Sequence, residues 1–362
     1  MKNKKLLNYS DYLQLNKLLE SQSLMSDKNG QKAHDEMLFI IIHQTYELWF
    51  KQIIHELDLV GHLFSQKTID ESKVSNAVLK LNRIIEIQKI LIDQIRVLET
   101  MTAMDFLEFR DYLFPSSGFQ SAQFRIIENR LGLHQSDRLS YMNKNYKDAI
   151  KDDEKDLVNT SESVKSIFDL LERWLERTPF LSFEGFEFWE KYSESVTTLL
   201  KEEENLIRNR PNQSGEELEF NLKSHKNTVS SFQAFLSSEK HEELINKGEK
   251  RLSHKATKAA LLIFLYRDEP ILHSPFNLLS KLMDIDELFT NWRQRHATMV
   301  HRMIGGKIGT GGSSGHKYLR SAAQKHKIFS DLSDLSTFFI KRSALPKLPK
   351  NIKNSLGYYH QS

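Results

Sequence analysis

Helical spacing of apolar residues runs through almost the whole of this 362-residue chain. Between Asp35 and Val60, and again between Val78 and Leu98, apolar side chains recur three and four positions apart, the period of one helix face. Similar spacing is found in residues 164–175, 186–200, 218–236 and 256–266. No run alternates as a half-buried strand does. The 14 glycines and 7 prolines are about half of the usual share. The sequence therefore predicts an all-α fold, a multi-helix bundle.

The composition excludes several kinds of site and indicates where in the cell the protein is found. The chain has no cysteine, which excludes disulfides, cysteine-ligated zinc, iron–sulfur clusters and thiolate-ligated haem. A net charge of +3 does not indicate a nucleic-acid or membrane partner. The longest apolar runs, 37–42 and 259–266, are too short to span a bilayer, and no signal-peptide core follows the basic start. We therefore expect a cytoplasmic protein that binds neither nucleic acid nor a membrane.

Breaks in the helical pattern suggest how the chain is organised. Residues 1–28 form a short N-terminal arm, set off by a polar stretch that begins near its end. Residues 201–255 are rich in charge and poor in aromatic residues, which favours a small helical insertion. Residues 29–200 and 256–362 are then expected to form one helical core that holds the functional site.

One histidine lies within an aromatic stripe of the first long helix. Phe39, His43 and Tyr46 are spaced so that they share one helical face. Such a histidine is either a functional group or an ordinary residue of the core, and the spacing alone does not separate the two. Glu47 lies four residues after His43, but one histidine and one glutamate make a weak metal site.

An arginine precedes a serine- and glycine-containing loop. Phe106 and Arg110 share a helical face, and Ser117 and Gly118 follow a few residues later. An arginine beside aromatic residues can clamp a carboxylate through two parallel hydrogen bonds. The alternative is a surface arginine that pairs with Asp111 or Glu108.

A second histidine lies near the C-terminal end of the chain. Trp292, His296 and Val300 lie on one side of a helix. This setting suits an axial ligand of haem iron, and it also suits a plain core. The segment 305–315 that follows holds six of the 14 glycines. It matches neither of the common phosphate-binding glycine motifs, so we favour a lid that fits closely over a ligand.

Four stretches of the chain together resemble the tryptophan 2,3-dioxygenase family, the haem enzymes of tryptophan catabolism. They are YSDYLQL from residue 9, HDEMLFIIIHQTYELWFKQ from residue 34, LETMTAMDFLEFRDYLFPSSGFQSAQFR from residue 98 and HATMVHRMIGGKIGTGGSSG from residue 296. The resemblance implies an α-helical homotetramer with one haem b per subunit. It further implies that both atoms of O2 are inserted across the C2–C3 bond of the L-tryptophan indole, which gives N-formyl-L-kynurenine.

The resemblance also implies a role for each matching residue. His296 would be the axial ligand of the haem iron, with Trp292 and Val300 beside the cofactor, and His43 the catalytic residue that faces the indole N–H. Arg110 would hold the substrate carboxylate. The other substrate-binding residues would be Phe39, Tyr46, Phe106, Ser117, Gly118 and Thr310, with Tyr9 and Tyr12 reaching the site of a neighbouring subunit. Gly306 stands where the family pattern leads us to expect a serine.

Two other functions stay open at this point. One is a haem enzyme on the same scaffold that inserts a single oxygen atom into an aromatic substrate. It would be expected to change the amino-acid clamp or the distal residue, whereas Arg110, Thr310 and His43 are all present. The other is a helical haem-binding or scaffold protein without catalysis, which would not consume tryptophan.

Overall fold

A computed structural model describes residues 6–139, 145–179, 181–183, 185–310 and 316–356 of the chain. Helices make up most of it, and the all-α prediction is confirmed. None of the helices in the described ranges is both long enough and apolar enough to cross a membrane.

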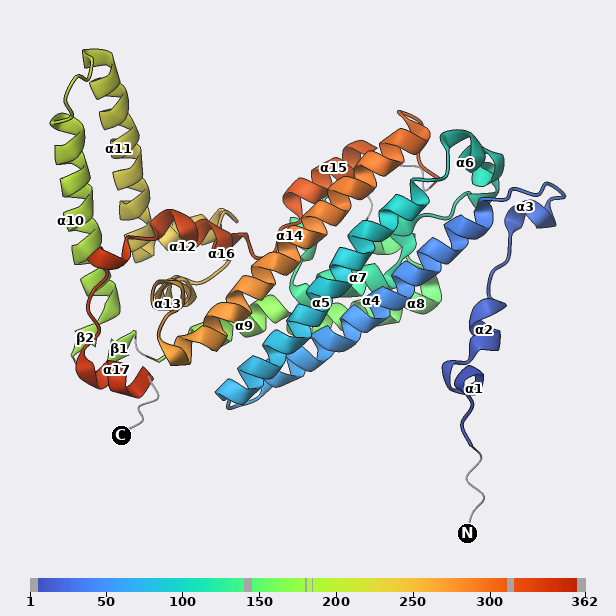
Figure 1. Ribbon diagram of the computed structural model, residues 1–362, viewed down its shortest axis with the longest axis horizontal. Coiled ribbons are helices and arrows are strands. Elements are labelled where there is room, and N and C mark those ends of the chain that lie inside the picture. The colour runs from blue at the N-terminus through green and yellow to red at the C-terminus, as the bar shows by residue number, and fades with distance from the viewer. Residues whose placement is uncertain (1–5, 140–144, 180, 184, 311–315, 357–362) are drawn as a thin grey trace, which may run out of the picture.

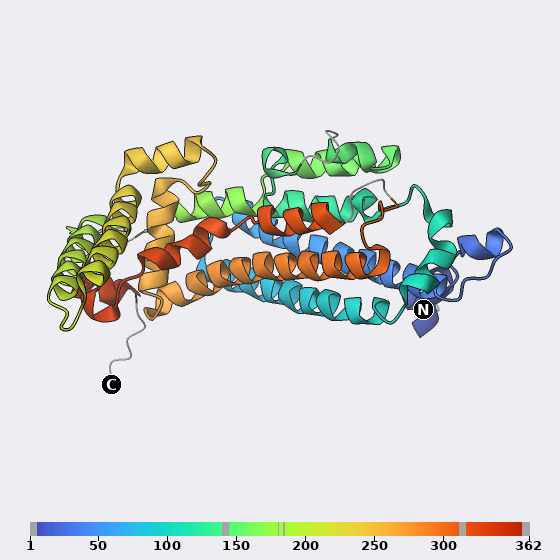
Figure 2. The same cartoon turned by 90° about the horizontal axis from the view of Figure 1, so that it is seen from above.

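Three long helices form the centre of the molecule: α4 (Glu36–Ser65), α5 (Glu71–Leu98) and α14 (Pro270–Ile304). They lie side by side along the long axis, with α7 (Ala122–Leu131), α9 (Ile167–Leu175) and α15 (His316–Lys325) packed around them (Figures 1 and 2). Their facing sides carry fully buried aliphatic residues such as Ile53, Leu81 and Leu279. Each such side chain contributes roughly 1.5–3 kcal/mol through its removal from water, which explains why the apolar periodicity is so regular.

Two buried polar contacts fix the middle of α14. The side-chain amide of Gln88 on α5 donates a hydrogen bond to the carbonyl oxygen of Ile285, over 3.0 Å. The carboxylate of Asp286 accepts hydrogen bonds from the backbone N–H groups of Ile328 and Phe329, over 3.0 and 3.1 Å. These contacts tie α14 to α5 on one side and to the segment after α15 on the other.

Shorter elements complete the bundle. The remaining helices of the body are α6 (Ala103–Arg110), α8 (Asp152–Ser163), α13 (His254–Leu265), α16 (Ser330–Asp334) and α17 (Lys350–Leu356), with short 3-10 turns between several of them. Two two-residue strands, β1 (Ser182–Phe183) and β2 (Phe186–Glu187), pair antiparallel. We expected no strand and expected a helix from 186. The helix begins at Phe188 instead, because residues 186 and 187 pair with β1.

A helical hairpin lies at one end of the molecule, built from α10 (Phe188–Arg208) and α11 (Gly215–Leu236), with α12 (Ser238–Asn246) beside it (Figure 1). The charge-rich segment is thus helical, as its composition indicated. Residue 201, where we placed the start of the insertion, lies within α10, which is continuous on both sides of it. The division into domains stays a prediction.

The N-terminal arm lies at the other end (Figure 1). Its helices α1 (Tyr9–Leu13) and α2 (Leu15–Leu19) contain no buried residue. The arm is anchored through α3 (Met25–Lys28), where the buried carboxylate of Glu36 accepts hydrogen bonds from the backbone N–H groups of Met25 and Ser26, over 2.7 and 2.9 Å. A second contact lies just before α3, where the Gln22 side-chain amide donates to the side-chain oxygen of Gln44 on α4 over 2.8 Å. The part that projects from the body is therefore the segment with α1 and α2.

Candidate functional site

One large cavity lies among α4, α6, α7, α14 and α15, with a volume of about 270 Å³. Every site residue predicted from the sequence lines it, except Tyr9 and Tyr12. The lining set is Phe39, His43 and Tyr46 on α4, Phe106 and Arg110 on α6, Ser117 and Gly118, Trp292, His296 and Val300 on α14, and Thr310. Residues from five separate parts of the sequence therefore meet in one place.

The aromatic stripe of α4 forms one wall of this cavity. The ring of His43 lies 4.1 Å from the ring of Phe39, which in turn contacts Phe106 at 5.8 Å between centroids. The Nδ1 atom of His43 lies 2.7 Å from the carbonyl oxygen of Phe39, one turn earlier. A carbonyl oxygen can only accept, so Nδ1 carries the proton of the neutral ring. The Nε2 atom of the neutral ring is consequently a hydrogen-bond acceptor.

His296 lies on the α14 wall and stacks on Trp292. Their ring planes are within 11° of parallel, and the centroids are 5.6 Å apart. Trp292 is itself packed against Phe124 at 5.2 Å and Tyr46 at 6.0 Å. These contacts fix the orientation of the imidazole, as a metal ligand requires.

Burial keeps both histidines uncharged. Burial lowers the pKa of His296 to about 4, and repulsion from His43 acts in the same direction. Burial also lowers the pKa of His43, against the opposing effects of its hydrogen bond to Phe39 and of nearby Glu47. Solvent reaches the His43 ring, yet the surrounding protein still disfavours its charged form. Both rings are therefore neutral at pH 7, and each retains a nitrogen lone pair for a ligand.

Arg110 is positioned by the short helix α6. Thr102 and Asp105 form a reciprocal capping box at its first turn, which fixes where the helix begins. At its other end, the Arg110 guanidinium donates to the carbonyl oxygen of Ile308, two residues before Thr310. Its Nε–H is buried and has no partner among the described residues. Arg110 therefore retains a donor for a ligand and contacts the start of the glycine-rich segment, of which 311–315 lie outside the described residues.

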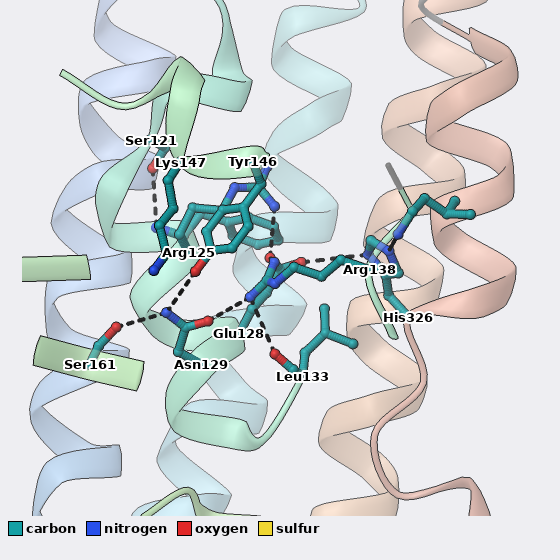
Figure 3. Close-up of polar contacts among 12 residues, drawn as sticks. Ser121, Arg125, Glu128, Asn129, Leu133, Arg138, Tyr146, Lys147, Ser161 and His326 are labelled. Carbon is teal, nitrogen blue, oxygen red and sulfur yellow. Dashed lines mark hydrogen bonds and ion pairs between the residues drawn. The ribbon is translucent and has the colours of Figure 1, made fainter. Parts of the chain in front are cut away.

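A buried charged cluster lies at the wall formed by α7, α14 and α15 (Figure 3). The carboxylate of Glu128 receives the guanidinium groups of Arg125 at 2.7 Å, Arg293 at 2.9 Å and Arg138, all nearly inaccessible to solvent. Burial alone would raise the pKa of Glu128, but the three arginines outweigh it and lower the pKa below its usual range.

His326 completes this cluster as a neutral group. Its Nε2 atom accepts a hydrogen bond from the backbone N–H of Leu139 over 3.1 Å. Burial, together with the nearby arginines, lowers its pKa to about 4. The cluster therefore holds three cations and one anion. Arg125, Glu128, Arg293 and His326 all line the cavity, so this wall carries an excess of positive charge.

Sequence reasoning did not single out this cluster. Arg125 and Glu128 are three residues apart on one helix, but that spacing is also typical of an ordinary surface pair. The partners Arg293 and His326 come from far along the chain, so only the tertiary structure joins them. No group of three metal-ligating side chains occurs in the described ranges, so the pair His43 and Glu47 gains no third ligand.

Tyr9 and Tyr12 are not brought to the cavity of their own chain. They are 72% and 70% exposed, on the projecting arm. None of the residues that the structure describes covers them, and their expected contact with a neighbouring subunit stays a prediction.

Comparison with known proteins decides the family. A family model described as tryptophan 2,3-dioxygenase matches residues 2–339. The chain belongs to the tryptophan 2,3-dioxygenase family. A protein named tryptophan 2,3-dioxygenase from Bdellovibrio bacteriovorus is 48% identical over 98% of this chain and 99% of its own length. Proteins with the same name from Xenopus tropicalis and Dictyostelium discoideum are 48% and 46% identical over 96% and 97% of this chain.

The tryptophan 2,3-dioxygenase family supplies the enzyme class. The chain is an enzyme of this family, a dioxygenase among the oxidoreductases, as the sequence motifs predicted. The alternative of a scaffold without catalysis is thereby disfavoured. The roles of the individual cavity residues stay predictions.

Proposed function

We propose that this chain uses haem b, one per subunit, to insert both atoms of O2 across the indole C2–C3 bond of L-tryptophan, with N-formyl-L-kynurenine as product. The observation that carries the proposal is the pair of neutral histidines, His43 on α4 and His296 on α14, that line one largely apolar cavity in a chain of this family. The monooxygenase alternative shares the cavity but has no observation in its favour.

The residues of the cavity fit a haem. A neutral imidazole at His296 can bind iron, and its stacking on Trp292 holds the ring still. Val300 and Met303, on later turns of α14, add apolar lining beside it. The propionates of a haem need cationic partners, and Arg125 has a buried Nε–H that no described group accepts. The positive wall around Glu128 is suited to those propionates.

Other residues of the cavity fit the amino acid. Arg110 retains a donor for the carboxylate, and the Thr310 hydroxyl lies two residues from its contact at Ile308. Phe39 and Phe106 offer aromatic faces to the indole ring. Ser117, Gly118 and Tyr46 line the same space.

His43 sets the orientation of the indole. Since its Nδ1–H is held by the Phe39 carbonyl, its Nε2 atom accepts. Tryptophan has two donor groups, the ammonium and the indole N–H, and with the carboxylate end held by Arg110 the indole N–H is the donor for His43. Haem, when bound, supplies the iron that binds O2. The chain's residues fix the indole relative to that iron and exclude bulk water through their apolar lining.

The arm suggests that sites are shared between subunits. Leu6, Leu7, Leu19, Tyr9 and Tyr12 are each more than two-thirds exposed, an apolar surface that an isolated arm in water would not favour. We propose a homotetramer in which each arm covers the cavity of a neighbouring chain. A cytoplasmic location belongs to the same proposal, and cell fractionation tests it.

The decisive experiment is a single-turnover assay. Reduced, haem-loaded protein is mixed with L-tryptophan and isotopically labelled O2, and the product is examined by absorbance and mass. Formylkynurenine with two labelled atoms supports the proposal. One labelled atom would establish the monooxygenase alternative, and no loss of tryptophan would refute both.

A mixing experiment tests the shared sites. A chain that lacks residues 1–20 and a chain that carries Arg110→Ala are allowed to exchange subunits. If arms are shared, some mixed assemblies combine an intact arm with an intact cavity and recover activity. No recovery, after exchange has been demonstrated with labelled subunits, would refute the shared arm while leaving the dioxygenase proposal intact.

A further inference from the structure

The basic residues of this chain are unevenly distributed along it. From 288 to 330 there are 43 residues without a single aspartate or glutamate, and they include eight of the lysines and arginines. The rest of the chain has 43 basic and 48 acidic residues, a net charge of −5. The positive net charge of the whole protein therefore comes from this one segment.

The described residues of this carboxylate-free segment, 288–310 and 316–330, form a wall of the cavity. They comprise the C-terminal half of α14, the residues up to Thr310, α15 and the turn that follows. The inner face of this wall supplies lining residues on every turn, among them His296, Val300, Tyr318 and Ala322. Figure 1 shows α14 and α15 side by side in this part of the molecule.

The outer face of the same wall carries free cations. Arg302, Arg320 and Lys325 are exposed, and none of them forms an ion pair with a described residue. Arg293 and Arg295, by contrast, are paired with Glu128 and Glu99. Unpaired exposed cations add little to stability, but they make the electrostatic potential outside this wall more positive.

The positive potential continues to the interior of the cavity. The cluster around Glu128 leaves an excess of positive charge in the lining. The acidic groups on the other walls are Glu47 in the cavity, the exposed Glu108 on α6 and the exposed Asp111 directly after it. Cations thus lie on the solvent-facing side of this wall and also on its cavity-facing side. Such an arrangement concentrates an anion in a cleft.

Tryptophan does not need this arrangement. It is a zwitterion without net charge at pH 7, so a positive field neither attracts nor repels it as a whole. Haem is an anion, because both of its propionates are ionised. The field therefore discriminates between the two molecules that enter the cavity.

We propose that the carboxylate-free segment is an electrostatic guide that accelerates the entry of anionic haem into the apoprotein. This inference rests on the proposed haem site. The guide acts on the rate of cofactor loading and leaves turnover of the loaded enzyme unchanged, since tryptophan carries no net charge. The Debye length is about 10 Å at 0.1 M salt and shortens as salt is added. The effect of the guide on the loading rate is therefore strongest at low salt and fades at higher salt.

The test compares two variants with the same change in net charge. One is Arg302→Gln/Arg320→Gln/Lys325→Gln on the guide. The matched control is Lys201→Gln/Lys223→Gln/Lys226→Gln, three lysines on α10 and α11 at the far end of the molecule (Figure 1). The probe is carbon-monoxide-bound ferrous haem, a dianion, whose uptake by the full-length apoprotein is followed by stopped-flow absorbance across a salt series.

We expect the association rate constant of the unaltered chain to fall as salt rises. The guide variant should load on the order of tenfold more slowly at low salt and match the unaltered chain at high salt. The control should load at the unaltered rate. Final haem content and turnover with tryptophan should be equal in all three proteins, which also verifies that the variants fold.

Three outcomes would overturn the guide. A loading rate independent of salt would exclude steering. Equal slowing of both variants would assign the effect to total charge rather than to the segment 288–330. A normal loading rate in the guide variant would show that Arg302, Arg320 and Lys325 do not accelerate haem entry. A chain that takes up no haem at all would refute the proposed haem site instead, so the two failures are distinguishable.

Discussion

Replacing Glu128 with glutamine should destabilise the protein more than almost any other single change of a carboxylate. The Glu128 side chain is 3% exposed and faces three guanidinium groups that are each less than a tenth exposed. Glutamine removes the only anion of the cluster and leaves the three cations buried. Removal of one partner from a buried ion pair costs about 3–5 kcal/mol. With a denaturant slope near 3 kcal/mol/M, the urea midpoint should fall by about 1–2 M.

The matched control is Asp93→Asn. Asp93 pairs with Arg96 at 2.6 Å, but both side chains are about two-thirds exposed. Water already screens that pair, so its loss should leave the urea midpoint within error. Unfolding of the two variants is followed by circular dichroism at pH 7. If Glu128→Gln lowers the midpoint no more than Asp93→Asn does, the guanidinium cluster is not the source of stability inferred here.

The same variant makes a prediction about pH. The pKa of Glu128 in the folded protein lies below its unfolded value of about 4.5. The contribution of Glu128 to the free energy of unfolding is therefore fully present above pH 4.5. The contribution is lost as the pH falls through the lower, folded pKa. The difference in unfolding free energy between the unaltered chain and Glu128→Gln should therefore be constant from pH 7 to about pH 5 and shrink in stronger acid. A difference that grows below pH 4 would contradict this sign.

Three further outcomes are expected. Arg110→Ala should weaken tryptophan binding by about 2–5 kcal/mol and leave haem content unchanged, measured by titration; equal binding of tryptamine and tryptophan by the unaltered chain would contradict the clamp. Gly132→Ala should lower the melting temperature markedly, since the residue has φ of +117° and its new Cβ would lie 2.6 Å from the Cβ of Phe168. Haem affinity should be constant from pH 8 to about pH 5 and fall near pH 4, because His296, with a pKa of about 4, must be neutral to bind iron; a decline already near pH 6.5 would show an unperturbed histidine.

Much of the fold and of the cavity could be predicted from the sequence for one reason. A helix with one buried face carries a regular apolar period in its sequence, and that period alone predicts α4 and α5. The cavity residues lie in motifs whose resemblance to a family located them together. Spacing alone left His43, Arg110 and His296 ambiguous, because an apolar neighbourhood suits a ligand and a core residue equally.

The features that could not be predicted depend on contacts between residues far apart in the sequence or on elements too short to show a pattern. The Glu128 cluster joins residues more than 150 positions apart, and no single helix face reveals it. The strand pair at 182–187 is two residues long, too short for an alternating pattern. The exposure of Tyr9 and Tyr12 follows from where the anchor at Glu36 ends, which only the structure shows.

The length of α14 has a mechanical consequence for His296. At a rise of about 1.5 Å per residue, the helix is about 52 Å long, and His296 stands about 39 Å from its start. Pivoting about that start by one degree would displace the imidazole by about 0.7 Å, whereas ligand distances in metal sites hold to within about 0.2 Å. The contacts at Ile285 and Asp286 move the pivot to about 15 Å from His296 and reduce the displacement to about 0.3 Å. Gln88 and Asp286, two buried polar side chains that do not line the cavity, thus contribute to the accuracy of the proposed ligand position, together with the ion pairs of Arg293 and Arg295 nearer to His296.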